Sequence, residues 1–277
     1  MSAGDIAWAD GRFLPLRDVM IAPLDRGFAL GDGVFETILW DGRRLRAFDG
    51  HAARLAHAAA FFDIPLPTGG EELARVLRRL ARENGFDGLS AGLRVTLTRG
   101  QGPRGLAPPE VVQPRLIATA QACTPARDPA RLVTVTIRRN PFSPTSAFKT
   151  LSYADNVLAL REARAKGGDE ALMLDVFGRI SCASAANLFF LRNNRILTPP
   201  LSAAALPGVT RARVLRLLGR MGLKLTEDAG GPESLVGVEA AFLTNSLIGV
   251  RPIARIDDTT FQSDHPLAAR LALELAQ

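Results

Sequence analysis

The chain has 277 residues, of which 47% are apolar and 22% charged, and its formal net charge at pH 7 is +6. This is the composition of an ordinary globular protein and excludes a disordered, collagen-like or long coiled-coil chain, while the length predicts about two domains. No apolar run approaches the roughly 20 residues of a membrane helix, and residues 1–15 lack the pattern of a signal peptide, so a cytoplasmic location is expected.

The first half of the chain predicts a small α/β domain in residues 1–120. A buried strand is expected at 34–40, and the following Asp41-Gly42 is a hairpin signal. Helical spacing of apolar residues predicts two amphipathic helices, and two short apolar runs after them predict strands. The helices are expected at 50–62 and 71–84, and the strands at 93–98 and 116–120. Residues 121–130, with two prolines among small and polar residues, are interpreted as a linker.

The second half predicts a larger domain in residues 131–277 with an antiparallel or mixed sheet. A helix over 152–166 is expected to begin with a capping box, because Asp155 follows Ser152 by three residues. Another helix is expected over 209–221. Short strands are predicted at 132–137, 171–174, 179–182, 188–191, 196–198 and 240–244. The expectation is a two-domain α/β fold.

Lysine is rare in this chain and occurs only at Lys149, Lys166 and Lys224. Lys149 lies between a Ser- and Pro-containing loop and the start of a helix, where an amine can be held in a cleft. Such a lysine suits Schiff-base chemistry if partial desolvation beside a cationic group lowers its pKa. A surface ammonium is the alternative, and most lysines are of that kind.

Three segments offer groups that bind anions. Val209 and Thr210 stand at a helix start, where backbone N–H groups and the helix dipole favour a phosphate, although a plain capped helix has a similar sequence. Ser246 follows a strand and offers a hydroxyl. Arg54 lies on the polar side of the helix over 50–62 and can pair with phosphate, although an exposed arginine is the commoner outcome.

These segments together resemble the class IV (fold-type IV) pyridoxal-phosphate enzymes, which include branched-chain aminotransferases, D-amino-acid aminotransferases and 4-amino-4-deoxychorismate lyases. The matching motifs stand in order over nearly the whole chain, which makes the resemblance specific. They are 25–27 (DRG), 31–37 (GDGVFET), 51–55 (HAARL), 149–159 (KTLSYADNVLA), 186–189 (ANLF), 206–211 (LPGVTR) and 245–248 (NSLI).

The resemblance implies roles for individual residues. Lys149 would form the Schiff base with pyridoxal 5'-phosphate, and Tyr153 would hydrogen-bond the phenolic oxygen of the cofactor. The resemblance also implies a cofactor cleft between the two halves and a homodimer in which each site receives a loop from the partner. The phosphate would be bound by the side chains of Arg54 and Ser246 and by the backbone of Val209 and Thr210.

One position departs from the family pattern. A glutamate normally stands where this sequence has Cys182, and its carboxylate keeps the pyridine nitrogen of the cofactor protonated. A neutral thiol supplies no such charge, so the ring becomes a weaker electron sink when the substrate loses its α-proton. The enzyme then tolerates weaker stabilisation, or its chemistry needs less of it, or it is not an efficient aminotransferase.

The substrate side of the site is carried by fewer residues. Phe35 and Leu247 are expected to line the substrate pocket, with core packing as the alternative for Phe35. Residues 99–105 resemble a loop that supplies a carboxylate-binding arginine in D-amino-acid aminotransferases. This resemblance nominates Arg104, for which a solvated loop arginine is the alternative.

The remaining counts exclude other kinds of function. Cys123 and Cys182 are too few for a disulfide scaffold or a four-thiolate metal site, and both are expected to be reduced. His51, His57 and His265 are too dispersed for a metal cluster. The arginines are scattered without interleaved aromatic residues, so the positive charge favours small anionic ligands over nucleic acid.

The sequence therefore predicts a pyridoxal-phosphate-dependent aminotransferase that moves an amino group between an amino acid and a 2-oxo acid. An aminodeoxychorismate lyase, which would eliminate pyruvate on the way to folate, is the alternative. A cofactor-binding protein with little turnover is a third interpretation, because Cys182 replaces the usual acid.

Overall fold

The chain folds into two compact units in this computed structural model, which describes residues 5–228 and 230–276. The first unit comprises the chain up to Pro125 together with Lys149–Ser152, and the second comprises Ala126–Phe148 and the chain from Tyr153 onward. Lys149–Ser152 belongs to the first unit because its backbone pairs with a strand there. Phe35 N donates to Lys149 O at 2.9 Å, and Leu151 N donates to Gly33 O at 2.9 Å. The boundaries at residues 120 and 131 remain a prediction.

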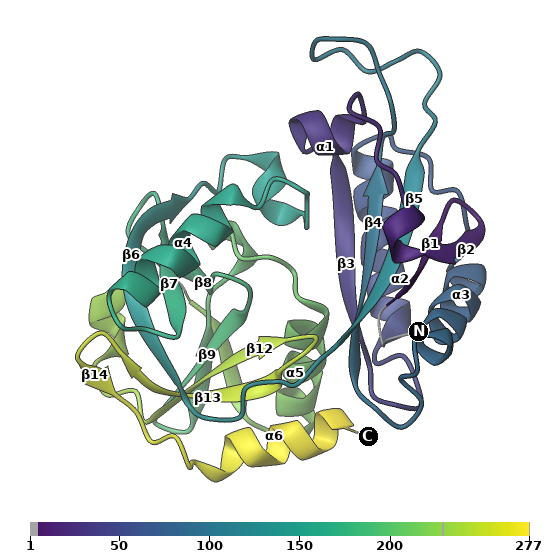
Figure 1. Ribbon diagram of the computed structural model, residues 1–277. Coiled ribbons are helices and arrows are strands. Elements are labelled where there is room, and N and C mark those ends of the chain that lie inside the picture. The colour runs from purple at the N-terminus through teal and green to yellow at the C-terminus, as the bar shows by residue number, and fades with distance from the viewer. Residues whose placement is uncertain (1–4, 229, 277) are drawn as a thin grey trace. The chain divides into compact units, whose positions relative to one another are not determined.

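The first unit is a five-stranded antiparallel sheet with helices packed against it (Figure 1). Helix α2 packs on strand β3, and α3 packs on β1, β4 and β5. In sheet order the strands are β2 (Arg12–Pro15), β1 (Ile6–Ala9), β5 (Arg115–Ala122), β4 (Ala91–Thr98) and β3 (Gly33–Trp40), and the helices are α1 (Arg26–Leu30), α2 (Phe48–Phe61) and α3 (Gly70–Glu83).

The predicted turn at Asp41-Gly42 forms a short hairpin, in which Trp40 pairs antiparallel with Leu45 in a single bridge and Arg46 N donates to Leu39 O at 2.8 Å. Strand β3 pairs along its whole length with β4, from Gly33 opposite Thr98 to Trp40 opposite Ala91, and α2 and α3 intervene in the chain. The Asp41 side chain stabilises the turn, because its Oδ1 accepts from the backbone N–H groups of the two arginines that follow Gly42. The end of β3 therefore pairs briefly with the segment that follows the turn, while its long partner is the distant strand β4.

The second unit is a mixed sheet of nine strands that curls into a half-barrel (Figure 1). The pairs β10–β11, β13–β6 and β6–β7 are parallel, and the other pairs are antiparallel. In sheet order the strands are β11 (Lys224–Glu227), β10 (Arg195–Thr198), β9 (Asn187–Arg192), β12 (Ala240–Asn245), β13 (Gly249–Ile256), β6 (Ala130–Arg139), β7 (Glu170–Asp175) and β8 (Ile180–Ala183). The short strand β14 (Thr259–Thr260) pairs with β13. The helices of this unit are α4 (Ala154–Ala165), α5 (Val209–Arg220) and α6 (Pro266–Ala276).

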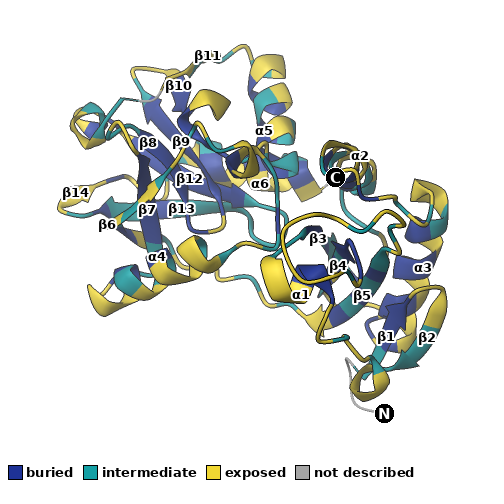
Figure 2. Cartoon of the chain, turned by 90° about the horizontal axis from the view of Figure 1, so that it is seen from above, coloured by how far each residue is buried: buried dark blue, intermediate teal, exposed yellow. Residues whose placement is uncertain are grey.

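Strand alternation divides the apolar residues of this sheet between its two faces. Leu188 and Phe190 belong to the cluster on the concave side, whereas Phe189 stacks on Phe242 beneath α5 and α6 with ring centroids 5.1 Å apart. A third cluster lies under α4 and contains Cys182. Strands β7, β8, β9 and β12 are buried along most of their length (Figure 2), which explains why their sequences are nearly continuous apolar runs.

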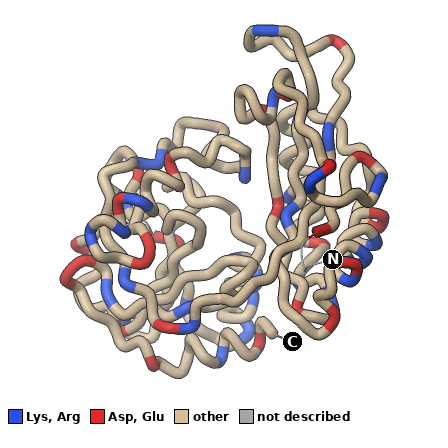
Figure 3. Tube along the Cα trace, in the orientation of Figure 1, with Lys and Arg blue, Asp and Glu red and all other residues tan. Residues whose placement is uncertain are grey.

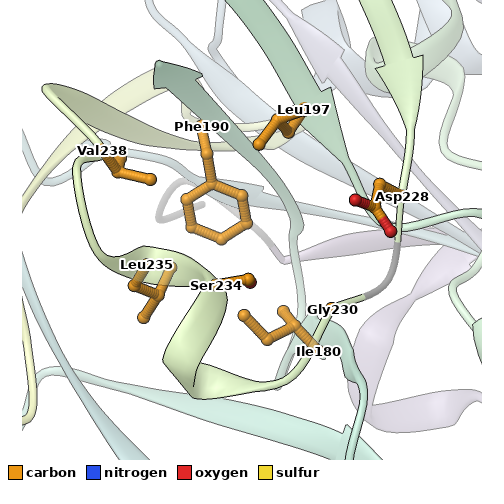
Figure 4. Close-up of a pocket in the computed structure, with 8 residues that line it drawn as sticks. All are labelled: Ile180, Phe190, Leu197, Asp228, Gly230, Ser234, Leu235 and Val238. Carbon is orange, nitrogen blue, oxygen red and sulfur yellow. The ribbon is translucent and has the colours of Figure 1, made fainter.

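The concave side holds a small cavity of about 10 Å³, room for one water molecule (Figure 4). Its wall is mostly apolar, with Phe190 and Leu235 facing the space and Asp228 at its edge. A cavity of this size and lining is a packing defect, so it offers nothing to a substrate.

The predicted capping box at the start of α4 is wrong. The helix begins at Ala154, its N-cap is Tyr153, and no side chain caps it. Ser152 belongs to the first unit, where its hydroxyl lies 2.4 Å from the place that a Cβ on Gly31 would occupy. The Ser152 hydroxyl therefore lies against Gly31 of the first unit and does not cap α4.

Candidate functional site

A buried carboxylate organises the basic side chains of the first unit. Glu36 on β3 is 1% exposed, and a buried charge is tolerated only with partners. His51 and Arg54 supply them from one face of α2, where their spacing of three residues places them side by side. Arg54 donates from Nε to Oε1 at 2.7 Å and from Nη2 to Oε2 at 2.8 Å, and His51 Nδ1 lies 2.7 Å from Oε2.

These partners keep Glu36 ionised. Burial acts to raise the pKa of Glu36, but hydrogen bonds from Arg54 and His51 and their charges outweigh it and hold the pKa below its usual value. The carboxylate is therefore a fixed negative charge that orients the Arg54 guanidinium.

Lys149 lies at the edge of the same sheet. Its Nζ is 4.1 Å from the centroid of the Phe35 ring, and the guanidinium carbon of Arg94 lies 3.8 Å from that centroid. Burial, together with the positive charges of Arg54 and Arg94, lowers the pKa of Lys149 to about 8, while Glu36 acts in the opposite direction. A lysine in this state is partly neutral near pH 7 and can act as a nucleophile and a base.

The first unit thus brings together three of the predicted site residues: Lys149, Arg54 and Phe35. Phe35 is buried, yet its ring contacts two basic groups, which ordinary core packing does not provide. The excess of positive charge around Lys149 suits an anionic ligand. Sequence reasoning missed Arg94 and gave His51 no role, although the spacing of His51 and Arg54 on one helix face was a usable signal. It placed Glu36 only in the strand motif expected to line the substrate pocket and did not foresee its pairing with Arg54.

In the second unit, the start of α5 is open to a ligand. Its N-cap is Gly208, which has no side chain to accept the first N–H groups, and the first backbone bond of the helix runs from Ala212 N to Gly208 O. The N–H groups of Val209 and Thr210 precede that bond and so have no partner within the helix. The Thr210 side chain is buried beside them. The geometry is that of an anion-binding helix start.

The turn after β12 holds Ser246 and Leu247 in place. The side chain of Asn245 accepts from Leu247 N at 3.0 Å and from Ile248 N at 2.9 Å, and it donates from Nδ2 to Ala185 O at 3.1 Å. These bonds make an Asx turn that fixes the backbone on either side of Ser246.

Tyr153 and Cys182 are the other predicted cofactor residues of the second unit. Tyr153 is half-buried at the N-cap of α4. Cys182 on β8 is 7% exposed and packs in the cluster beneath α4, and Ser181 Oγ donates to its Sγ at 3.7 Å. Burial raises the pKa of the Cys182 thiol, although the charge of Arg139 and the Ser181 bond oppose it, so the thiol is neutral at pH 7.

Arg104 is exposed, and the loop that carries it is held by a buried arginine that sequence reasoning gave no role. Arg26 donates to three successive carbonyl oxygens, those of Gly105 at 3.1 Å, Leu106 at 2.8 Å and Ala107 at 3.1 Å. The loop backbone is therefore fixed next to Arg104.

Basic and acidic side chains are interspersed along the chain (Figure 3). Among the residues that the structure describes, no group of three His, Cys, Asp or Glu side chains is placed to hold a metal ion. No helix within residues 5–228 and 230–276 has both the length and the apolar character needed to span a membrane.

A lysine with a lowered pKa can bind a carbonyl compound, and an uncapped helix start can bind a phosphate. The sequence model of the class IV amino-transferases matches residues 33–256. The chain belongs to the class IV aminotransferase family.

Known proteins similar to this chain include both aminotransferases and a lyase. A putative branched-chain-amino-acid aminotransferase of Methanocaldococcus jannaschii is 31% identical over 260 residues, which cover 90% of this chain and 87% of that protein. The aminodeoxychorismate lyase of Bacillus subtilis is 26% identical over 259 residues, which cover 92% of this chain and 88% of the lyase. The crystal structure of the branched-chain aminotransferase of Thermoproteus uzoniensis with norvaline has a TM-score of 0.89 and 28% identity, and the match covers 99% of this chain and 94% of that one.

These similarities confirm the predicted fold-type IV architecture and the predicted cofactor. The enzyme uses pyridoxal 5'-phosphate. The residues present fit that group, because Lys149 has a pKa of about 8 and α5 begins with uncapped N–H groups. A further observation agrees: Thr244 is 0% exposed, and its hydroxyl has no hydrogen-bond partner among the described residues.

Proposed function

We infer that this enzyme transfers an amino group between an amino acid and a 2-oxo acid. The observation that carries the proposal is the lowered pKa of Lys149, about 8, beside Arg54 and Arg94. When bound, pyridoxal 5'-phosphate supplies the carbonyl that accepts the amino group and a ring that withdraws electrons from the α-carbon. Lys149 Nζ would take up the α-proton of the substrate, which requires the neutral amine, and would then deliver that proton as the ammonium.

The other site residues are assigned by the same proposal. Arg54 and Ser246 bind the cofactor phosphate with the N–H groups of Val209 and Thr210. Tyr153 would donate a hydrogen bond to the phenolic oxygen of the cofactor, and Cys182 would face its pyridine nitrogen. The two hydrogen bonds from the Arg54 guanidinium to the Glu36 carboxylate support the assignment of Arg54 to the phosphate. An arginine that is already oriented loses less conformational entropy when it binds phosphate.

The substrate carboxylate is assigned to arginines of the first unit. Arg94 is exposed at its side chain and lies over the same Phe35 ring as Lys149, which supports a role beside the reacting amine. Arg104 is the second candidate, on the loop that Arg26 holds. Phe35 is assigned to the wall of the pocket, together with Leu247.

The lyase is the second candidate function. Its support is the similarity to the Bacillus subtilis aminodeoxychorismate lyase, which is 26% identical to this chain. The two are distinguished by incubating the pure holoenzyme with single amino acids, with 2-oxo acids and with aminodeoxychorismate. A change in the visible absorption spectrum of the holoenzyme when an amino acid is added supports transamination. Release of pyruvate from aminodeoxychorismate supports the lyase. A protein that does neither is a cofactor binder.

The assembly and location of the enzyme are part of the proposal. Exposed apolar side chains at Met20, Leu24 and Phe28 precede or lie in α1, and Leu106 is exposed on the Arg104 loop; they support a homodimer. Sedimentation at micromolar concentration should give about twice the mass of the chain, and a monomer would contradict the proposal. The proposed compartment is the cytoplasm, where free amino acids and 2-oxo acids meet, and cell fractionation tests it.

A further inference from the structure

The first residue of β9 reaches the chain segment that leads into α5. Asn187 is 7% exposed, and its Nδ2 donates to Leu206 O at 2.9 Å. Because Leu206 O can only accept a hydrogen bond, the side-chain nitrogen of Asn187 faces Leu206 and its side-chain oxygen Oδ1 faces away from it. Asn187 Oδ1 lies against Gly208.

The contact with Asn187 requires a residue without a side chain at position 208, whereas the backbone conformation there does not. The φ of −67° and ψ of 134° of Gly208 are open to any residue. A Cβ on Gly208 would lie 2.1 Å from Asn187 Oδ1, far inside contact distance, and 3.2 Å from the Cβ of Arg211. The amide of Asn187 therefore occupies the space that a side chain at the N-cap would need.

A buried hydroxyl stands next to this amide. Thr244 on β12 is directly opposite Asn187 in the antiparallel ladder, so both side chains project from the same face of the sheet. This is the face on which Phe189 and Phe242 pack beneath α5. The Thr244 hydroxyl is 0% exposed and has no partner among the residues the structure describes, so its hydrogen bond is available to a bound group beside Asn187.

We propose that Asn187 is a positioning residue for phosphate binding: its amide clamps the Leu206–Gly208 backbone and so aims the first N–H groups of α5 at the cofactor phosphate. The inference rests on the proposed assignment of Val209 and Thr210 to the phosphate. The N-cap then has two properties at once. It lacks a side chain that would compete with the ligand, and it is held against the sheet by a hydrogen bond from outside the helix.

The test compares two ligands that differ only in the phosphate, pyridoxal 5'-phosphate and pyridoxal. Dissociation constants are measured by absorbance titration of the full-length protein. Asn187→Ala should raise the constant for pyridoxal 5'-phosphate about tenfold and change that for pyridoxal less than about twofold. Thr198→Val is the matched control, since Thr198 Oγ1 also donates to a backbone carbonyl, Leu188 O at 2.7 Å, from a fully buried position. It should lower the melting temperature without changing the ratio of the two constants.

A double-mutant cycle separates a specific effect on phosphate binding from a general loss of folding stability. Gly208→Ala alone should raise the pyridoxal 5'-phosphate constant about as much as Asn187→Ala, because the new Cβ expels the amide. In the Asn187→Ala background the same change should add less than about twofold. If Asn187→Ala does not fold, Asn187→Ser takes its place in the cycle, since it removes the amide and keeps a polar side chain.

The outcomes separate the inference from the proposed function. A wild type that does not prefer pyridoxal 5'-phosphate over pyridoxal would overturn the phosphate assignment itself. A wild type that prefers it, with the preference retained in the Asn187 variant or with independent effects in the cycle, would overturn only the role of Asn187.

Discussion

Arg54 is bound to Glu36 side-on, through two nitrogens on one edge of its guanidinium, 2.7 Å from Nε to Oε1 and 2.8 Å from Nη2 to Oε2. The pair joins a strand to a helix, and His51 completes it from the next turn of α2. Because Glu36 is buried and ionised, neither side chain can leave the other without exposing an unpaired charge to an apolar surrounding. The guanidinium is therefore oriented before any phosphate arrives.

Replacing this arginine should weaken cofactor binding. Arg54→Ala removes a charge-assisted partner of the phosphate, which costs on the order of 1.5 to 3 kcal/mol, or roughly a tenfold to hundredfold rise in the dissociation constant of pyridoxal 5'-phosphate. Arg46→Ala is the matched control, because Arg46 is also largely buried and pairs with Asp41 at 3.1 Å. Equal affinities in the wild type and the Arg54 variant would remove Arg54 from the site.

The pKa of Lys149 predicts how cofactor capture depends on pH. Only the neutral amine attacks the cofactor carbonyl, and with a pKa of about 8 roughly a tenth of Lys149 is neutral at pH 7. The rate at which the ligand-free protein combines with pyridoxal 5'-phosphate should rise tenfold per pH unit below 8 and level above it. Glu36→Gln should move the midpoint down, since the Glu36 charge raises this pKa. Stopped-flow absorbance gives the profile, and a midpoint near 10 would contradict the prediction.

The same lowered pKa has a consequence for stability. An unfolded lysine has a pKa of about 10.4, so between pH 8 and 10 the unfolded chain binds more protons at Lys149 than the folded chain does. Folding stability from this group therefore rises with pH across that window and is lowest below pH 8. Lys149→Met should stabilise the ligand-free protein at pH 7, and the gain should shrink toward pH 10. Melting curves at both pH values measure it, and a gain that does not change with pH would count against the prediction.

The covalent attachment point can be identified directly. The holoenzyme should be yellow, and borohydride should fix the cofactor to Lys149, because the other two lysines lie in different surroundings. Lys166 is exposed and pairs with Glu162 at 2.7 Å, and Lys224 is exposed on β11. Peptide mass mapping locates the link, and Lys149→Ala should abolish it. A link on Lys166 or Lys224 would make the assignment wrong.

Sequence patterns were informative where a structure depends on local periodicity. The helices expected at 50–62 and 71–84 exist as Phe48–Phe61 and Gly70–Glu83, because an apolar stripe and a nearby sheet are all they need. Strand β13 was not predicted. It contains Pro252 and is only half-buried along much of its length, so neither alternation nor an apolar run marks it.

The site was predictable to the extent that its residues stand in local motifs. Lys149, Arg54 and the start of α5 were named from flanking sequence. The contacts that set their chemistry join distant parts of the chain, such as Glu36 with Arg54 and Asn187 with Gly208. In the sequence, Glu36 is only a polar residue in an apolar strand. Its partner is chosen by how α2 packs on β3, and no local pattern encodes that packing.

Cys182 leads to the last prediction, which concerns the protonation of the cofactor ring. The thiol packs beneath α4 among Val135, Ala159 and Met173, and burial raises its pKa, so it carries no negative charge at pH 7. Without a counter-charge, the pyridine nitrogen should be largely unprotonated in the wild type. Arg139 adds to this effect, since a positive charge that acts on Cys182 also opposes a proton nearby.

Cys182→Glu should raise the proton affinity of the ring nitrogen and speed removal of the α-proton if transamination is the native reaction. Nitrogen-15 NMR of labelled cofactor reports the protonation state, and single-turnover kinetics report the proton step. Cys182→Ser is the control, because it changes the same atom without adding charge and should leave the resonance in place. A protonated ring in the wild type would refute the prediction and require another acid. Glu170 would then be the one to test, because its charge reaches Cys182 and its Oε1 accepts from Ser184 N at 3.0 Å, just beyond β8.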